Sequence, residues 1–122
     1  PLIARASRDS RISIDSAAIS RSAGARVIAN SLGMRASDSN TTINWYVMGM
    51  AIAGEEITSF DNEGDFSYFD KDLDAKIEKT ADDFAARVLA CLGASKMQGY
   101  KGKILLNPSL TSEFLLDSLV YH

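Results

Sequence analysis

The residues that could perform acid–base or metal chemistry gather at the C-terminal end of this 122-residue sequence. Asp117, Ser118 and His122 lie close together there, and His122 is the sole histidine. Ser118 and His122 are four positions apart and would share a helix face, but no acid is placed to orient the histidine. Asp117 and His122 are five apart, or about 140° of rotation on a helix, which separates them for metal binding. From spacing alone, we predict an ordinary helix end with a surface histidine.

The single cysteine, Cys91, is a second candidate for chemistry. It follows Phe84 by seven positions and Val88 by three, on the apolar stripe of a predicted helix. A buried cysteine behaves as a small hydrophobic side chain. We therefore predict that Cys91 packs in the core. One cysteine also excludes an internal disulfide.

Acidic residues crowd the segment from Glu55 to Asp74. Two carboxylates held together there could serve as general acid and base. Most of them, however, fall in predicted turns or at a predicted helix start, where negative charge favours solubility and the helix N-terminus, and this is the interpretation that we favour. The glycines at 93, 99 and 102 lack the spacing of a phosphate-binding loop, and they precede a strand rather than a helix.

The overall composition is that of one soluble domain, with 46% apolar and 24% charged residues and a net charge of −3. Residues 1–40 carry six arginines and three acids, whereas residues 41–85 carry three lysines and eleven acids. The arginines are diluted by Ser and Ala, so we expect exposed strand faces and no nucleic-acid partner. No run of about 18 apolar residues is present, so we expect no membrane span.

The first half of the sequence predicts an antiparallel β-meander. Alternating polar and apolar residues predict a strand at 11–15, an apolar-rich run predicts the strongest strand at 41–53, and a weaker pattern predicts a strand at 25–29. The strand at 41–53 is apolar on both faces, which predicts a central strand covered on both sides, and Gly49 predicts a bulge or a close neighbour. Return strands are predicted at 56–60 and 66–69. Turns are predicted at 30–33, 37–40, 54–55 and 61–65.

The second half predicts helices. Apolar spacing indicates a long helix from about Asp72 to Leu92, with Gly93 as its left-handed C-terminal cap. A strand at 101–106 is predicted to follow. Asn107 then begins a final helix as N-cap, with Pro108 at the first helical position. The fold class is therefore α+β: a β-meander, a long helix, one further strand and a C-terminal helix, which we expect to be one domain over residues 1–122.

The order of these features resembles the central region of the TldD/PmbA family, whose members are often labelled modulators of DNA gyrase. The resemblance covers roughly residues 10–122. It rests on Leu92-Gly93-Ala94-Ser95-Lys96-Met97-Gln98-Gly99, on the following Leu105-Leu106-Asn107-Pro108, and on the final Leu115-Leu116. The Ala-rich long helix departs from the family at Thr80, where we expect Gly. The sequence begins Pro-Leu-Ile and stops within an apolar pattern, so we expect an internal fragment of a longer protein.

The resemblance implies an intracellular, two-subunit metallopeptidase in which one subunit type carries an HExxxH zinc motif and its relative does not. The corresponding stretch here is 115–122, in which His122 matches. Asp117 stands at the first His position and Ser118 at the Glu position. The Glu activates zinc-bound water, which Ser cannot do near neutral pH. The resemblance therefore implies the metal-less, PmbA-type member: no catalytic residue, no bound metal and no cofactor in this chain.

Two interpretations follow from these observations. In the first, the chain is the central domain of a non-catalytic, cytoplasmic partner subunit, which associates with a TldD-type subunit or with itself. The complex acts on peptides, and an exposed sheet edge could take an extended peptide by strand addition. In the second, it is a small stand-alone α+β domain that binds a small ligand between helix and sheet. The first predicts that Leu115, Leu119 or Tyr121 is exposed. Direct modulation of DNA gyrase is disfavoured by the acidic middle segment.

Overall fold

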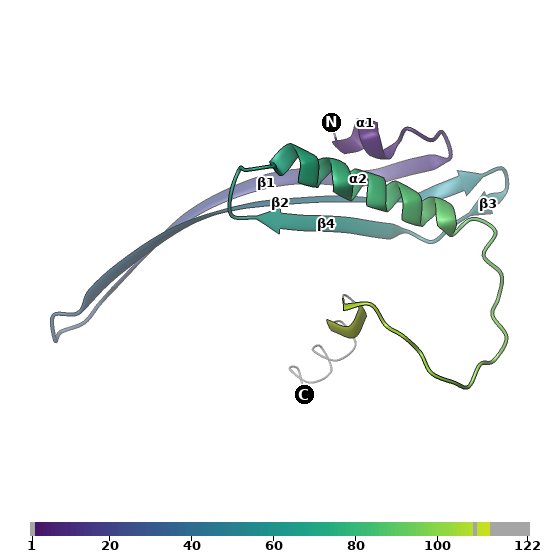
Figure 1. Ribbon diagram of the computed structural model, residues 1–122. Coiled ribbons are helices and arrows are strands. Elements are labelled where there is room, and N and C mark those ends of the chain that lie inside the picture. Colours follow the sequence, from purple (N-terminus) through teal and green to yellow (C-terminus); the bar gives the residue numbers. More distant parts are fainter. Residues whose placement is uncertain (1, 109, 113–122) are drawn as a thin grey trace.

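The computed structural model describes residues 2–108 and 110–112. Figure 1 shows an antiparallel sheet with two helices on one face and a long two-stranded extension at one end. The α+β class is thus confirmed. The elements, in chain order, are α1 (Leu2–Ala6), β1 (Ile12–Ala29), β2 (Arg35–Ala53), β3 (Glu56–Ile57), β4 (Asp61–Ser67) and α2 (Leu73–Ala90).

The sheet is a meander centred on β2. β1 pairs with β2 from Ile12–Ala51 to Ala29–Arg35. β3 pairs with the last residues of β2, and β4 pairs with β2 from Gly49–Asp61 to Ile43–Ser67. We call the three-stranded part with its helices the body (residues 2–21 and 43–92). The two-stranded hairpin beyond β4 is the arm (residues 22–42).

In the body, β2 alternates between a covered and an open face. The side chains at 43, 45, 47 and 51 are buried under the helices, and Phe84, Val88, Ala81 and Ile77 of α2 pack against them. We call this the helix-side face. On the opposite face, which we call the open face, Tyr46 and Ile52 are exposed and Met48 and Met50 are half-buried. The prediction that β2 is covered on both sides is therefore wrong for the described residues, because both helices lie on one face.

Gly49 sits where β1 bulges against β2. The pairing register shifts between Ile14 and Ser16, opposite this glycine. A Cβ at position 49 would lie 2.3 Å from the Ser13 carbonyl oxygen and 3.0 Å from the Ile14 Cα. Only a residue without a side chain allows the two backbones to approach so closely. The predicted bulge and close neighbour are both confirmed.

The arm is one uninterrupted hairpin. The residues at 25–29 belong to the same strand as 11–15, and the predicted turn at 37–40 is wrong because these residues pair with β1 throughout. Both faces of the arm are solvent-exposed, so its strands do not need the alternating apolar residues that mark a half-buried strand. The chain reverses at 30–34, which confirms the turn predicted at 30–33, and there the Asn30 side chain accepts hydrogen bonds from the Leu32 and Met34 backbone N–H groups. Gly33 has φ 85°, a left-handed conformation that suits glycine.

Two other strand predictions need correction. The predicted turn at 61–65 is wrong, since these residues form most of β4, an edge strand whose acidic side chains bind α2 or face solvent. The return strand predicted at 56–60 shortens to β3, and β4 ends at Ser67 rather than at Phe69. The acidic composition of β4 is typical of a turn, and a basic partner on α2 makes it compatible with a strand.

The long helix agrees closely with its prediction. It spans Leu73–Ala90, and Gly93 has φ 77°, as expected for a left-handed residue after a helix. Asp74 lies in the first turn. Asp72 occupies the N-cap position with φ 57° and makes no side-chain capping hydrogen bond, so its carboxylate can favour the helix N-terminus only through its charge.

After α2 the chain runs as an extended, exposed segment. The strand predicted at 101–106 is absent, because no strand among the described residues supplies its hydrogen-bond partners. Asn107 does act as an N-cap: its side chain accepts a hydrogen bond of 2.8 Å from the Leu110 backbone N–H. The rest of the predicted final helix lies outside the described residues. Within the described part, no helix has the length and apolar character needed to cross a bilayer.

Candidate functional site

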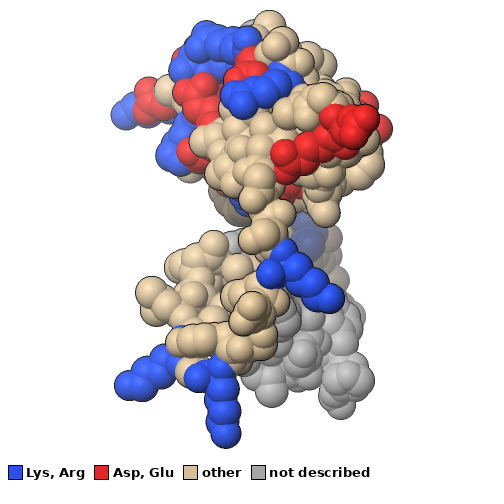
Figure 2. Space-filling model, turned by 90° about the vertical axis from the view of Figure 1, so that its right-hand side faces the viewer, with Lys and Arg blue, Asp and Glu red and all other residues tan. Residues whose placement is uncertain are grey.

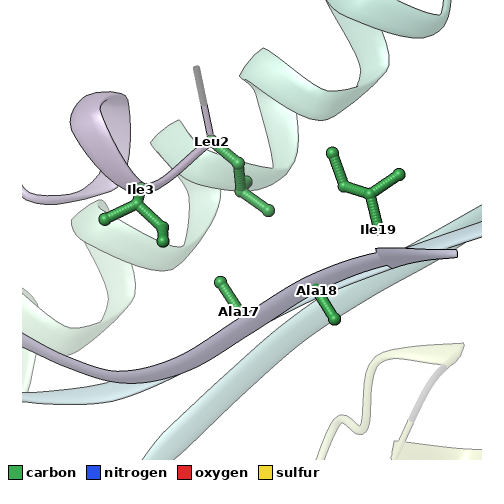
Figure 3. Close-up of a pocket in the computed structure, with 5 residues that line it drawn as sticks. All are labelled: Leu2, Ile3, Ala17, Ala18 and Ile19. Atoms are coloured by element: carbon green, nitrogen blue, oxygen red, sulfur yellow. The ribbon is translucent and has the colours of Figure 1, made fainter.

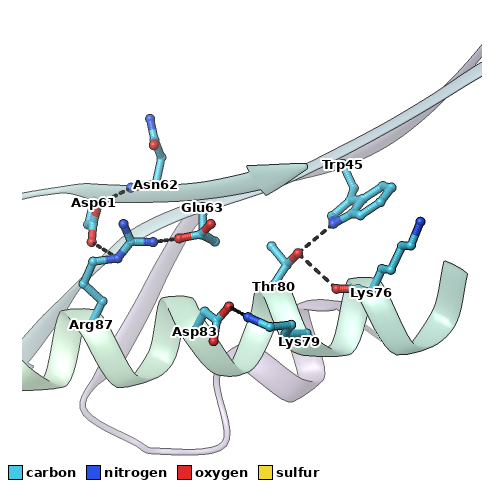
Figure 4. A network of polar contacts seen from close by, with 9 residues as sticks. All are labelled: Trp45, Asp61, Asn62, Glu63, Lys76, Lys79, Thr80, Asp83 and Arg87. Atoms are coloured by element: carbon cyan, nitrogen blue, oxygen red, sulfur yellow. Dashed lines mark hydrogen bonds and ion pairs between the residues drawn. The ribbon is translucent and has the colours of Figure 1, made fainter. Parts of the chain in front are cut away.

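A buried polar contact joins the sheet to α2 at the centre of the body. The Trp45 indole N–H donates to the Thr80 hydroxyl at 2.8 Å, and that hydroxyl donates to the Lys76 carbonyl oxygen at 3.1 Å (Figure 4). Trp45 is 2% and Thr80 6% exposed. A buried indole N–H needs an acceptor. Thr80, the position at which the resemblance led us to expect Gly, supplies it.

Arg87 of α2 binds the acidic residues of β4. Its guanidinium forms ion pairs with Asp61, at 2.9 Å, and with Glu63 (Figure 4). Both carboxylates lie on the helix-side face, because their partners on β2 are Gly49 and Val47. Arg87 holds them as paired anions that tie the edge strand to the helix. The alternative of a general acid–base pair in this segment gains no support from this arrangement.

Arg5 anchors α1, an element that the sequence patterns did not predict. Its guanidinium forms a two-pronged contact with Asp82 at 2.7 Å and a further one with Glu78 at 2.5 Å. These hydrogen bonds hold the pKa of Asp82 below its ordinary value. Leu2 and Ala6 are buried one turn apart on the same helix. This i, i+4 apolar pair, with Arg5 between, is the signal that could have identified α1.

Cys91 does not lie in the core. It is exposed, because α2 ends at Ala90 and Cys91 is the C-cap residue. The fully buried stripe ends at Val88, and Leu89 and Leu92 are partly buried against the core on either side of the exposed Cys91. The predicted packing of Cys91 is therefore wrong, since the helical periodicity was extended one residue beyond the end of the helix.

A small apolar pocket lies between α1 and β1. Its volume is about 270 Å³, and it is lined by Leu2, Ile3, Ala17, Ala18 and Ile19. Figure 3 shows Leu2 and Ile19 pointing into the space between helix and strand. Small-molecule sites usually add a few polar groups that orient the ligand. The five lining side chains offer none, so the pocket can hold an apolar group but cannot orient a polar substrate.

The open face carries no charged side chain on β2, β3 or β4. Cross-strand partners share a face, so the pairing registers assign its residues. The nine that β2, β3 and β4 contribute are all uncharged: Asn44, Tyr46, Met48, Met50, Ile52, Ile57, Asn62, Gly64 and Phe66. A Cβ at Gly64 would lie 2.8 Å from the Trp45 carbonyl oxygen and 3.1 Å from the Tyr46 Cβ, so the glycine allows β4 to approach β2 closely at this point.

Charge lies elsewhere on the molecule. Figure 2 shows acidic and basic side chains mixed over the body and only basic ones on the described segment after α2. That segment contains Lys96, Lys101 and Lys103. On the arm, Arg26 and Arg35 are exposed on strands, as the sequence predicted. The uncharged open face is thus bordered by charged surfaces.

The positions expected to correspond to the zinc motif, Asp117, Ser118 and His122, lie outside the described residues, as do Leu115, Leu119 and Tyr121. Within residues 2–108 and 110–112, no group of three or more His, Cys, Asp or Glu side chains is placed to hold a metal ion. The chemistry predicted at the C-terminal end therefore stays a prediction.

Residues 2–92 match the family described as the PmbA/TldA metallopeptidase central domain. The chain belongs to that family. The match begins at α1 and ends two residues after α2, so it covers the body and the arm together. No curated protein matches the chain. The PmbA/TldA central domain is therefore the sheet with its two helices, and the extended segment at 93–107 follows it.

Proposed function

We propose that this PmbA/TldA central domain is a non-catalytic assembly domain of a cytoplasmic, two-subunit metallopeptidase that acts on peptides. Its role is to hold a TldD-type subunit, which supplies the zinc motif. The single observation that carries the proposal is the uncharged open face. Exposed apolar patches on soluble proteins mark interaction sites, and the centres of such sites are depleted in charge and enriched in Met and aromatic residues. Tyr46, Met48, Met50 and Phe66 fit that composition.

The fold supports a scaffolding role. The core, formed by the helix-side face and α2, fixes the sheet, so the open face is presented on a rigid support. The outer edge of β1 has no strand partner among the described residues over its 18-residue length. An unpaired edge can receive an extended peptide by strand addition, which suits a complex with peptide substrates. The lone cysteine fits a reducing compartment.

The proposal is tested by co-purification with a zinc-bearing TldD-type subunit. We expect a stable complex that hydrolyses peptides, and we expect Met50→Lys to weaken its formation at least tenfold by placing a charge at the centre of the interface. Ser39→Lys adds the same charge on the exposed arm and serves as the matched control. Equal binding by both variants would remove the open face from the proposed interface.

The metal-less interpretation has its own test. Zinc titrated into the chain in a calorimeter should give no stoichiometric heat, because Asp117 and Ser118 replace a zinc-ligating His and the general base. Stoichiometric uptake with submicromolar affinity would overturn this part of the proposal. It would leave the open face untouched as an interaction surface, so the two parts can fail separately.

A further inference from the structure

The sheet has two outer edges, formed by β1 and by β4, and the strand pairing shows which backbone groups reach each edge. Successive residues of a strand direct their N–H and C=O groups toward opposite neighbours. The Ile52 N–H of β2 donates to the Arg11 carbonyl oxygen, on the β1 side, at 2.7 Å. Even-numbered residues of β2 therefore face β1 and odd-numbered ones face β4. Because odd residues of β2 pair with odd residues of β4, the even residues of β4 direct their N–H groups outward.

The β4 edge is closed by its own side chains. The Asp61 carboxylate accepts a hydrogen bond of 2.8 Å from the Asn62 N–H, and the Asp65 carboxylate accepts one of 2.8 Å from the Phe66 N–H. Both donors are outward-facing groups of the edge. With these donors occupied and a carboxylate beside each, the β4 edge is protected against the addition of a further strand.

The β1 edge is open by comparison. Beyond the bulge, Ala17, Ile19 and Arg21 pair with odd-numbered residues of β2, so their backbone groups face away from it. Within the described part of the chain, no hydrogen bond uses the N–H or C=O groups of these three residues. They recur at every second position, which is the spacing at which an extended peptide presents its own donors and acceptors. We call residues 17–21 the docking edge.

The apolar pocket lies directly beside the docking edge. Cross-strand partners share a face, so a peptide residue paired with Ile19 would direct its side chain to the helix-side face. There Leu2 and Ile3 of α1 lie above the strand and enclose the pocket of about 270 Å³ (Figure 3). The side chains of Ile3 and Ile19 are 52% and 51% exposed. A side chain of the size of leucine would cover both of them, and the main-chain hydrogen bonds of the edge would orient it.

A positive charge lies two residues beyond the pocket on the same face. Arg21 follows Ile19 on the helix-side face of β1, and its nearest acidic partner is Asp70, at 3.8 Å. Both side chains are largely exposed, at 65% and 69%. Such a long and solvated ion pair contributes little to stability. The Arg21 guanidinium is therefore accessible to an acidic side chain on a peptide residue paired with it.

We propose that the docking edge binds an extended peptide that carries an apolar residue and, two positions before it, an acidic residue. The peptide adds to β1 as an antiparallel strand, as in the rest of the sheet, with the apolar side chain in the pocket and the acidic one at Arg21. Main-chain hydrogen bonds supply affinity and the pocket supplies selectivity. This deepens the proposed function, on which it rests for the interpretation of the peptide as a substrate of the complex.

The first test uses the unchanged chain and a fluorescently labelled peptide, Thr-Asp-Thr-Leu-Thr-Thr, with blocked ends. Fluorescence anisotropy should show saturable binding in the micromolar range. Replacing the leucine by lysine should weaken binding at least about tenfold, because a charge cannot enter the apolar pocket. N-methylation of the leucine should weaken it about tenfold by removing an N–H that faces the edge. N-methylation of the next threonine is the matched control, because its N–H faces away, and should have little effect.

The second test changes the chain. Ala17→Phe fills the pocket and should weaken binding at least about tenfold. Ala23→Phe makes the same change on the same face of β1, beyond the pocket, and should bind like the unchanged chain. Arg21→Glu should weaken binding about fivefold and should improve binding of a peptide whose aspartate is replaced by lysine. Arg26→Glu is its control on the other face of β1. Circular dichroism confirms that each variant is folded.

Several results would overturn the proposal. One is the absence of saturable binding, and another is an equal effect of the two N-methylations, which need no change to the chain. Peptide release as the chain self-associates at higher concentration would assign the docking edge to a second copy instead. Met50→Lys, the variant that tests the open face, should bind the peptide like the unchanged chain. Loss of subunit binding and loss of peptide binding can therefore be told apart.

Discussion

β1 and β2 run through both the body and the arm, yet the same two strands are packed in one region and exposed in the other. In the body, β4 extends the sheet and α2 covers the side chains of Ile43, Trp45 and Val47. In the arm neither is present, and the residues from Arg35 to Asn40 are all exposed. Pairing between two strands fixes the register in both regions. Burial, and with it most of the stability, depends on the third strand and the helix.

The largest effect that separates the two regions should come from the core. Phe84→Ala removes a side chain that is 0% exposed and packs under the sheet, and it should lower the free energy of unfolding by about 3–5 kcal/mol. Val27→Ala, on the arm, should change it by less than about 0.5 kcal/mol. Urea denaturation followed by tryptophan fluorescence measures both. Similar losses in the two variants would show that the arm is packed as tightly as the body.

A second comparison makes the same glycine-to-alanine substitution once in the body and once in the arm. Gly49→Ala would place a Cβ 2.3 Å from the Ser13 carbonyl oxygen, so the backbone must shift, and we expect a loss of about 1–3 kcal/mol. Gly24→Ala, in the arm, meets only the Asn40 side chain at 3.2 Å and should cost less than about 1 kcal/mol. Denaturant midpoints report both changes. A larger loss at Gly24 would contradict the assignment of the bulge as the constrained point.

The same contrast explains which parts of the fold could be predicted from sequence. The strand at 41–53, the helix predicted from about Asp72 to Leu92 and the bulge at Gly49 each depend on burial or close packing, and each is found in the structure, although only one face of the strand is covered by helices. The residues at 37–40 have polar side chains that are typical of a turn. They form a strand here because a two-stranded hairpin exposed on both faces does not need apolar side chains. The acidic residues of β4 are also typical of a turn. They fit a strand because Arg87 forms ion pairs with Asp61 and Glu63, and a pattern read over neighbouring residues cannot reveal a partner 24–26 positions away.

The candidate site was predictable only in part. Apolar residues on both faces of β2 predict that both faces are covered. In the structure one of them is the exposed open face, because an apolar pattern does not show what would cover it. Cys91 was misplaced by a single residue of helix length. Thr80 was noted only as a departure from the family, since its role requires Trp45, 35 positions away. The role of Thr80 depends on a contact between distant elements, whereas the position of Cys91 depends on where one helix ends.

A third prediction sharpens the contrast through that buried hydrogen bond. Thr80→Val keeps the shape of the side chain but leaves the Trp45 indole N–H without its acceptor, which should cost about 1–3 kcal/mol. Thr42→Val, on the half-buried base of the arm, is the matched control and should stay within about 0.5 kcal/mol. Replacing Trp45 by Phe in the Thr80→Val background should cost less than it does alone. Additive losses in that double-mutant cycle would show that the two groups are not coupled.

The smallest effect concerns the turn that leads into β1, at the end of the body farthest from the arm. The Arg11 side chain and backbone donate hydrogen bonds to Asp9 and lower the pKa of that carboxyl to about 2. Because the folded-state pKa lies below the ordinary value of 3.8, the stability from this pair is present above that value and is lost as the pH falls through 2. Asp9→Asn should therefore lower Tm slightly at neutral pH and progressively less as the pH falls through 2, and Arg11→Gln should give the same profile. Thermal unfolding followed across this pH range measures the difference.

Plots of Tm against pH that stay parallel to that of the unchanged chain would place the acid sensitivity of the body in other ion pairs. One such pair is Arg5 with Asp82, whose carboxyl also has a lowered pKa.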